Sequence, residues 1–282
     1  MKIAIQGGQT SFHDMASRQY FNGRPVELLE CRTFRHLCNA LQEKEADFAV
    51  MAIENSLVGS ILPNYALLQE YPLHIIGETY LHIRQHLMAL PGQTLADIHH
   101  VRSHPMALHQ CSYFLEEHPE IRAIETFDTA ESAREIRENN TEGVAAIASK
   151  LAAERYELEI LAEEIENLKQ NYTRFLILSR KVANNGIVPN KASINFHLKH
   201  QVGALAEVLD IFRKFRINLT LIQSIPMLGH PNEYAFHIDL EWPERESFEQ
   251  SLSVVRHFSK EIRILGIYPK GVLPYDYAGR AA

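Results

Sequence analysis

The chain has 282 residues, enough for two domains, and its contents of 46% hydrophobic and 22% charged residues are those of a globular protein. The net charge of −7, with both signs interspersed, argues against nucleic acid or an anionic membrane surface as the main partner. Three cysteines form no CxxC pair, which predicts free thiols in a reducing compartment. Because the first residues lack the layout of a secretory signal and no apolar run approaches the roughly 20 residues of a membrane helix, we expect a cytoplasmic protein.

The first 70 residues alternate short apolar segments with amphipathic ones. Ser11 lies three residues before Asp14, a spacing typical of the capped start of a helix. Alternating strands and helices predict a mostly parallel α/β sheet. The expected strands are 2–6, 26–31 and 47–53, and the expected helices begin near Ser11, after Thr33 and after Ser60.

A long extended stretch over residues 73–90 interrupts this alternation, which returns between residues 98 and 163. Pro105 fits the first turn of a helix, and Asp128 or Thr129 fits an N-cap. A last strand is expected at 173–178. The pattern predicts two α/β lobes, and a cleft between two lobes is a natural site for a small ligand.

Beyond this region, a segment rich in Asn, Gly and Pro predicts a linker. The order that follows is the βαββαβ arrangement of ferredoxin-like domains. The expected strands are 192–199, 217–226, 233–241 and 262–268, and the expected helices are 203–215 and 245–259. The predicted boundaries are 1–180 for the first domain, 181–191 for the linker, 192–270 for the second domain and 271–282 for the tail.

Three groups of polar residues follow predicted strands. The turn Gly7-Gly8-Gln9-Thr10-Ser11 opens a helix and is either an anion site or an ordinary turn; it fits no dinucleotide or nucleoside triphosphate motif. Glu54-Asn55-Ser56 with Gly59-Ser60 is either a polar ligand site at a sheet edge or a turn that caps the next helix. In Ser103-His104-Pro105, His104 is placed for proton chemistry near neutral pH.

The motif Asn171-Tyr172-Thr173-Arg174-Phe175 begins the last strand of the first domain. Thr173 offers one directed hydroxyl. Arg174 suits a bidentate pair with a carboxylate of a substrate or of the protein, and the residues alone leave both open. No HExxH motif or Cys/His cluster is present, so we expect neither a metal nor a cofactor.

Taken in order, these segments resemble the prephenate dehydratase family. The segments that carry the resemblance are Ile53-Glu54-Asn55-Ser56-Leu57-Val58-Gly59-Ser60, residues 103–111, residues 145–149 and Asn171-Tyr172-Thr173-Arg174-Phe175. The resemblance implies a carbon–oxygen lyase of phenylalanine biosynthesis that converts prephenate to phenylpyruvate. It also implies a bilobed catalytic domain like a periplasmic binding protein, with the active site in the cleft.

The resemblance also implies roles for single residues. Thr173 matches the threonine essential for dehydratase activity, and Asn55, Ser103 and Gln110 match polar active-site positions, with Glu54 a neighbouring acidic one. The remaining predicted substrate-binding residues are Thr10, Ser11, Ser56, Gly59, Ser60, Arg174 and Phe175.

In the second domain, Gly203-Ala204-Leu205-Ala206 and Asn218-Leu219-Thr220 resemble an ACT domain, the phenylalanine sensor of the family. This implies feedback inhibition by L-phenylalanine bound between paired ACT domains, and a homo-oligomer, expected as a dimer of dimers (a tetramer). The predicted effector-binding residues are Gly203, Ala204, Leu205, Asn218, Leu219, Gln223 and Ser224.

The sequence departs from the family pattern in three places. The first turn lacks the usual Gly-Pro-x-Gly, Met106 replaces the usual Gln after His-Pro, and Gln223-Ser224-Ile225-Pro226 replaces Glu-Ser-Arg-Pro. Two alternative functions are an arogenate dehydratase and a non-catalytic amino-acid sensor or solute-binding protein. A fusion to chorismate mutase is not expected, because no helical segment precedes Lys2.

Overall fold

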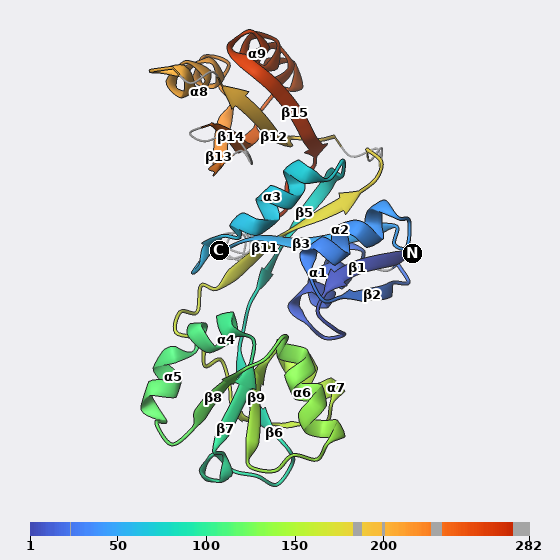
Figure 1. Cartoon of the computed structure of the whole chain (residues 1–282), viewed down its shortest axis with the longest axis vertical. Coiled ribbons are helices and arrows are strands. Elements are labelled where there is room, and N and C mark those ends of the chain that lie inside the picture. Colours follow the sequence, from blue (N-terminus) through green and yellow to red (C-terminus); the bar gives the residue numbers. More distant parts are fainter. Residues whose placement is uncertain (23, 183–187, 199–200, 227–232, 273–282) are drawn as a thin grey trace, which may run out of the picture. The chain divides into compact units, whose positions relative to one another are not determined.

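A computed structural model of the chain describes residues 1–22, 24–182, 188–198, 201–226 and 233–272 (Figure 1). The described residues form two compact units. Unit 1 comprises Met1–Gly59 and Thr79–Phe175, and unit 2 comprises Ser60–Glu78 and Leu176–Val272. This division passes through two strands of one sheet, so the predicted domain boundaries stay a prediction.

The predicted linker and tail fall partly on residues 183–187 and 273–282, which lie outside the described residues. No helix in the described part of the chain combines the length and the apolar character needed to cross a membrane. The three cysteines Cys31, Cys38 and Cys111 are free and buried.

The first sheet has the strand order β2-β1-β3-β11-β5, and β4 pairs with β3. Its β1 runs parallel to both β2 and β3, as predicted. Ser11 caps α1 by accepting a hydrogen bond from the Asp14 amide, which confirms the predicted helix start. The elements are β1 (Lys2–Gln6), α1 (Phe12–Tyr20), β2 (Glu27–Cys31), α2 (Phe34–Gln42), β3 (Phe48–Asn55), β4 (Gly59–Ser60), α3 (Leu62–Glu70), β5 (His74–His82) and β11 (Tyr172–Ser179).

The second sheet has the order β10-β6-β9-β7-β8 and is mixed. β7 is parallel to β8 and β9, but β6 is antiparallel to β9 and β10. The parallel sheet was predicted from residues 1–70, and β6 lies in the 73–90 stretch that interrupts that pattern, so its antiparallel pairing adds to the prediction. The elements are β6 (His86–Ala89), η1 (Leu95–Asp97), β7 (His100–Ser103), α4 (Pro105–Gln110), α5 (Ser112–Glu117), β8 (Arg122–Glu125), α6 (Thr129–Glu138), β9 (Val144–Ala148), α7 (Lys150–Arg155) and β10 (Glu159–Ala162).

Two helix starts in this region agree with the sequence prediction. Pro105 is the first residue of α4, where its missing N–H leaves no helical bond unmade. Asp128 is the N-cap of α6 and accepts a hydrogen bond from the Glu131 amide at 2.9 Å. Both predicted starts are therefore confirmed.

The third sheet belongs to a βαββαβ unit, as the sequence predicted. Its order is β13-β14-β12-β15, with antiparallel neighbours throughout. Alternate residues of β12, among them Ile194 and Phe196, are buried in one core with residues of α8 and α9. The elements are β12 (Lys191–Leu198), α8 (Ala204–Lys214), β13 (Asn218–Pro226), β14 (Tyr234–Glu241), α9 (Arg245–Phe258) and β15 (Ser259–Tyr268).

The other face of this sheet is polar, and α3 packs on it within unit 2. Arg263 of β15 donates hydrogen bonds to the carbonyls of Gln69 and Tyr71 at the C-terminal end of α3. A cation suits this end of a helix, because the last carbonyls lack intrahelical partners. The ring of Tyr65 meets His237 edge-on, with centroids 4.9 Å apart. The sheet therefore packs apolar residues against α8 and α9 and polar residues against α3.

Candidate active site

The predicted catalytic threonine lies in a buried hydrogen-bonded group in unit 1. Thr173 is in β11, and Asn55 is the last residue of β3, the strand next to β11 in the first sheet. The Asn55 amide nitrogen donates to the hydroxyl oxygen of Thr173 at 2.9 Å and to the side-chain oxygen of Asn171 at 2.8 Å. These contacts bring together two of the residues that the sequence predicted, from positions 118 residues apart.

Asn55 uses all of its hydrogen-bonding capacity within the protein. Its two amide hydrogens go to Thr173 and Asn171, and its oxygen accepts from the backbone amides of Leu57 and Val58 at 2.9 and 3.2 Å. Asn55 braces the turn after β3, but no side chain among the described residues caps α3, so the alternative of a helix-capping turn is not met. The predicted ligand-binding role of Asn55 stays a prediction. Its role in this geometry is to position other groups.

The group extends through Asn171 to two glutamines. Asn171 donates to the side-chain oxygen of Gln110 at 3.1 Å, and Gln85 donates to the same oxygen at 3.3 Å. The Gln110 side chain thus accepts two hydrogen bonds through its oxygen, which fixes the orientation of its amide. We call Thr173, Asn55, Asn171, Gln110 and Gln85 the amide network.

Two donors of the amide network are left for a ligand. Among the described residues, no acceptor is present for the hydroxyl hydrogen of Thr173 or for the amide nitrogen of Gln110. Both side chains are largely buried, with exposed fractions of 9% and 7%. Each is oriented by the bond it accepts, so the network presents one hydroxyl and one amide as directed, uncharged donors.

Asn171 and Gln85 were not predicted as site residues. Asn171 stands two positions before Thr173 in the recognised motif and is fully buried. Gln85 follows β5 and gave no signal in the sequence; its backbone amide bonds to Glu166 at 2.9 Å. Both positions depend on contacts between distant segments, which no local pattern reports.

Three predicted residues after β3 hold the adjoining turn. The Ser56 hydroxyl donates to the Gln170 carbonyl at 2.8 Å and accepts from the Tyr172 amide at 2.9 Å, so it fixes the start of β11. Gly59 is exposed and has φ of +82°, a conformation that glycine adopts without strain. Ser60 pairs in β4 beside it. None of the three joins the amide network.

Ser103 and Glu54 also lie outside the network. Ser103, at the end of β7, is fully buried, and its hydroxyl donates to the Ile147 carbonyl at 2.6 Å. The hydrogen of Ser103 is thus already used within the second sheet. Glu54 in β3 is half-buried.

The turn before α1 contains a carboxylate of the protein itself. The backbone amide of Thr10 donates to the Asp14 carboxylate at 2.9 Å, and that of Gln9 donates to Glu30 at 3.2 Å. The Ser11 side chain caps the helix. A substrate carboxylate at Thr10 and Ser11 would therefore have to compete with Asp14, and the predicted role of this turn stays a prediction.

His104 is the N-cap of α4, and its Nδ1 accepts a hydrogen bond from the Met106 amide at 3.2 Å. Burial lowers the pKa of His104, although Glu125 opposes this shift. The imidazole is therefore neutral at pH 7, with Nδ1 unprotonated. Met106, which stands where the family has Gln, lies in the first turn of the same helix.

Arg174 and Phe175 follow Thr173 in β11 and are buried, with exposed fractions of 4% and 1%. Because side chains alternate along a strand, Arg174 points to the face opposite Thr173. Phe175 packs edge-on against His13, with ring centroids 5.0 Å apart. The structure thus separates the guanidinium of Arg174 from the donor group of Thr173.

The predicted effector residues lie in unit 2 at three places. Gly203, Ala204 and Leu205 stand at the start of α8, whereas Asn218 and Leu219 begin β13, after the end of that helix. The 11 residues of α8 span about 16 Å at 1.5 Å per residue. Gln223 and Ser224 lie farther along β13. Within one chain, the helix length separates the first two groups.

The described residues offer no cluster of metal ligands. Among residues 1–22, 24–182, 188–198, 201–226 and 233–272, no group of three or more His, Cys, Asp or Glu side chains could bind a metal ion. The donors of the amide network are neutral amides and a hydroxyl, which act through hydrogen bonds.

The chain is similar to known proteins over nearly its whole length. Residues 3–183 match the family model described as prephenate dehydratase. The chain is 33% identical over 281 residues to the bifunctional chorismate mutase/prephenate dehydratase of Enterobacter agglomerans, which covers 98% of this chain and 72% of that protein. It is 35% identical over 285 residues to arogenate dehydratase/prephenate dehydratase 2, chloroplastic, of Arabidopsis thaliana, covering 95% and 73%.

The fold agrees with these matches. The crystal structure of prephenate dehydratase from Arthrobacter aurescens in complex with L-Phe has a TM-score of 0.85 and 29% sequence identity, covering 100% of this chain and 96% of that one. Fold and sequence together define the protein as a mixed α/β enzyme. Because the family model matches more than half of the chain, the protein belongs to the prephenate dehydratase family.

Proposed function

We propose that the protein catalyses the decarboxylative dehydration of prephenate to phenylpyruvate. One observation carries the proposal: the Thr173 hydroxyl accepts a hydrogen bond from Asn55 at 2.9 Å and keeps its own hydrogen for a ligand. The match of residues 3–183 to the family model supports the choice of reaction. A carbon–oxygen lyase of this kind needs a donor at the leaving oxygen and no charged nucleophile.

The difficult step is the departure of the ring hydroxyl. The electron pair of the breaking bond to the carboxylate enters the ring, carbon dioxide leaves, and the carbon–oxygen bond breaks as the ring becomes aromatic. The leaving hydroxide takes up a proton from the solvent and becomes water. Thr173 donates a hydrogen bond to this oxygen as negative charge develops there. An alcohol is a weak acid, so we assign it transition-state hydrogen bonding rather than full proton transfer.

The other predicted site residues complete this proposal. Asn55 and Asn171 position the two donors, and the Gln110 amide donates to a second oxygen of prephenate. Ser103, Glu54 and the turns at Thr10-Ser11 and Gly59-Ser60 are proposed to line the binding site, which lies in a cleft between the lobes formed by the two sheets. Thr173 and Gln110 then touch the substrate, whereas Asn55 acts through Thr173.

The test is product formation by the purified full chain. We expect phenylpyruvate, followed by its absorbance in alkali, to appear with prephenate at a rate that rises and saturates with substrate. The same assay with arogenate tests the alternative substrate, because arogenate differs from prephenate only in having an amino group in place of the keto group of the side chain. Turnover of arogenate alone would reassign the substrate, and no turnover of either would favour a non-catalytic sensor.

For regulation, we propose that the βαββαβ unit is an ACT domain that binds L-phenylalanine and inhibits the enzyme. The related prephenate dehydratase from Arthrobacter aurescens was crystallised in complex with L-Phe. The separation of Gly203–Leu205 from Asn218–Leu219 by the length of α8 supports a site shared by two chains. β13 is an edge strand, so its backbone groups are open to pairing.

This regulatory proposal includes a cytoplasmic homo-oligomer, a dimer of dimers, in which binding between paired ACT domains favours a less active state of the catalytic domain. Turnover of prephenate should fall as L-phenylalanine rises into the millimolar range, and Asn218→Ala should weaken that inhibition without changing basal turnover. Light scattering with and without the amino acid gives the oligomeric state. Unchanged turnover at millimolar L-phenylalanine would contradict the proposal.

A further inference from the structure

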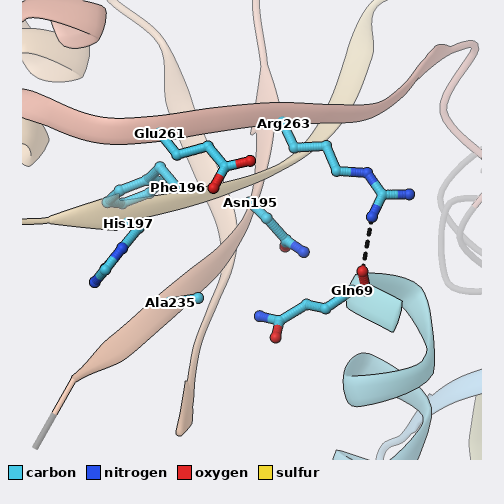
Figure 2. Close-up of a pocket in the computed structure, with 7 residues that line it drawn as sticks. All are labelled: Gln69, Asn195, Phe196, His197, Ala235, Glu261 and Arg263. Carbon is cyan, nitrogen blue, oxygen red and sulfur yellow. Dashed lines mark hydrogen bonds between the residues drawn. The ribbon is translucent and has the colours of Figure 1, made fainter. Parts of the chain in front are cut away.

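A pocket of about 240 Å³ lies in unit 2, between the C-terminal end of α3 and the polar face of the third sheet (Figure 2). Asn195 of β12 and Gln69 of α3 both line it. Glu261 and Arg263 of β15 also line it. None of the predicted effector residues does, so this pocket is distinct from the proposed phenylalanine site.

Two polar atoms in this pocket are buried and lack a partner among the described residues: the side-chain oxygen of Asn195 and the side-chain nitrogen of Gln69. Asn195 has an exposed fraction of only 7%. Figure 2 shows the amide ends of both side chains directed into the same space. One is an acceptor and the other a donor, and a buried polar atom without a partner is costly unless a water or a ligand completes it.

The pocket is also lined by Arg263 and Glu261, which carry charges of opposite sign, and by His197, whose Nε2 lies 2.8 Å from the Glu233 carboxylate. Arg263 donates through its two terminal nitrogens to the backbone carbonyls of Gln69 and Tyr71, so its positive charge is held at the C-terminal end of α3, on the backbone of Gln69. Glu261 is two residues away on the same side of β15, and its carboxylate partly offsets the lowering of the Arg263 pKa by burial. The acceptor Asn195 stands opposite Arg263 in the register of β12 and β15.

This arrangement matches a ligand with a carboxylate at one end and an ammonium group at the other. We propose that the pocket is a second ligand site that binds a free α-amino acid. The carboxylate accepts from Gln69 in the positive field of Arg263, and the ammonium donates to Asn195 and Glu261. The volume lies below the roughly 300–1,000 Å³ of pockets for drug-sized molecules, which restricts the ligand to amino-acid size.

Binding here would join two segments of unit 2. Gln69 is near the C-terminal end of α3, which begins two residues after Ser60. A ligand bonded to both Gln69 and Asn195 holds α3 against β12.

The test is calorimetric titration of the full chain with each of the 20 L-α-amino acids at millimolar concentration. We expect saturable binding of at least one of them, weakened about tenfold by Asn195→Leu and by Gln69→Leu, since each removes one hydrogen bond to a charged group. Gln250→Leu, on the exposed surface of α9, is the matched control and should leave binding unchanged. Thermal unfolding of each variant checks that the fold is intact.

Derivatives of the amino acid that binds test the assignment of both charges. Its N-acetyl and carboxamide forms should each bind about tenfold more weakly or worse, because each loses a charge-assisted hydrogen bond. The proposal is overturned if these derivatives bind as well as the parent amino acid, or if no amino acid binds, which would mean that only water fills the pocket. It is also overturned if Asn218→Ala abolishes binding while Asn195→Leu leaves binding intact. Prephenate turnover of the same samples tests the proposed function separately, because loss of activity would not alter the binding result.

Discussion

The two units bury polar side chains in different ways. In unit 1 the amide network contains no charge, and the hydrogen bonds of Asn55 and Asn171 orient Thr173 and Gln110. In unit 2 the buried contact is ionic: the Lys191 ammonium lies 3.0 Å from the Glu78 carboxylate, and both side chains are almost fully buried. A neutral network aims a donor at low electrostatic cost, whereas a buried ion pair fixes which segments pack together.

The largest effect should come from breaking that ion pair. Lys191→Met leaves Glu78 buried, with its bond from the Gly271 amide, 2.9 Å away, still in place. Breaking a buried ion pair by removing one partner costs about 3–5 kcal/mol, so the free energy of unfolding should fall by this amount in urea titrations. The double variant Lys191→Met/Glu78→Gln should recover most of the loss. A double variant as unstable as the single one would show that packing, not charge, stabilises this contact.

Removing the directed hydroxyl of unit 1 should have nearly as large an effect, but on turnover. Thr173→Val keeps the shape of the side chain and removes the donor, so kcat for prephenate should fall about 10²–10³-fold, or about 3–4 kcal/mol in barrier. Thr173→Ser keeps a hydroxyl at the same place and should retain far more activity. Near-normal turnover of Thr173→Val would refute the role of Thr173.

An intermediate effect on stability is expected at acidic pH, through protonation of His13, whose ring packs against Phe175. Burial, with a smaller contribution from His104, lowers the pKa of His13 to about 3 from its usual 6.5. Below pH 6.5 the unfolded chain takes up a proton that the folded protein refuses until about pH 3, so stability is lost as pH falls through this window. At about pH 5 the loss is about 2 kcal/mol at about 1.36 kcal/mol per pKa unit.

His13→Gln tests this expectation, because an amide side chain also offers an acceptor to the Ala52 amide, which bonds His13 at 3.4 Å. The drop in unfolding free energy between pH 7 and pH 5 should shrink by about 2 kcal/mol in the variant. His36, exposed at the first turn of α2, provides the control in His36→Gln, which should leave the drop unchanged. An equal drop in the His13 variant and the wild type would assign the acid sensitivity to other groups.

The sequence predicted element types well because their causes are local. Ser11, Pro105 and Asp128 mark helix starts by chemistry that acts within one turn, and the order of strands and helices in the βαββαβ unit follows from apolar periodicity. The antiparallel pairing of β6 could not be predicted, since it depends on how the chain crosses between sheets.

The candidate site was predicted less completely for the same reason. The motif identified Thr173 and Asn55, but their hydrogen bond depends on β3 and β11 becoming neighbours. Gln85 contributes through a single contact with Gln110, made across 25 residues, and nothing near it in the sequence marks it. Tertiary contacts thus decide which polar residues orient a hydrogen-bond donor toward the site. They also decide which residues, like Ser103, already donate their hydrogen bond within a sheet.

The smallest effect should come from Gln85, which is the member of the amide network farthest along the hydrogen bonds from Thr173. A variant at Gln85 tests how far from Thr173 the network still influences turnover. Gln85 donates to Gln110 at 3.3 Å, a long bond, and its own side-chain oxygen is buried without a partner among the described residues. Gln85→Leu removes both the weak bond and the unsatisfied atom, so the free energy of unfolding should change by less than about 1 kcal/mol. Gln110 keeps the bond from Asn171, and kcat should fall no more than about threefold, or about 0.6 kcal/mol.

Asn171→Leu is the matched comparison, because it removes the bonds to both Gln110 and Asn55 and should reduce kcat much further. Equal losses in the two variants would mean that the whole network, rather than its Thr173 end, orients the donors.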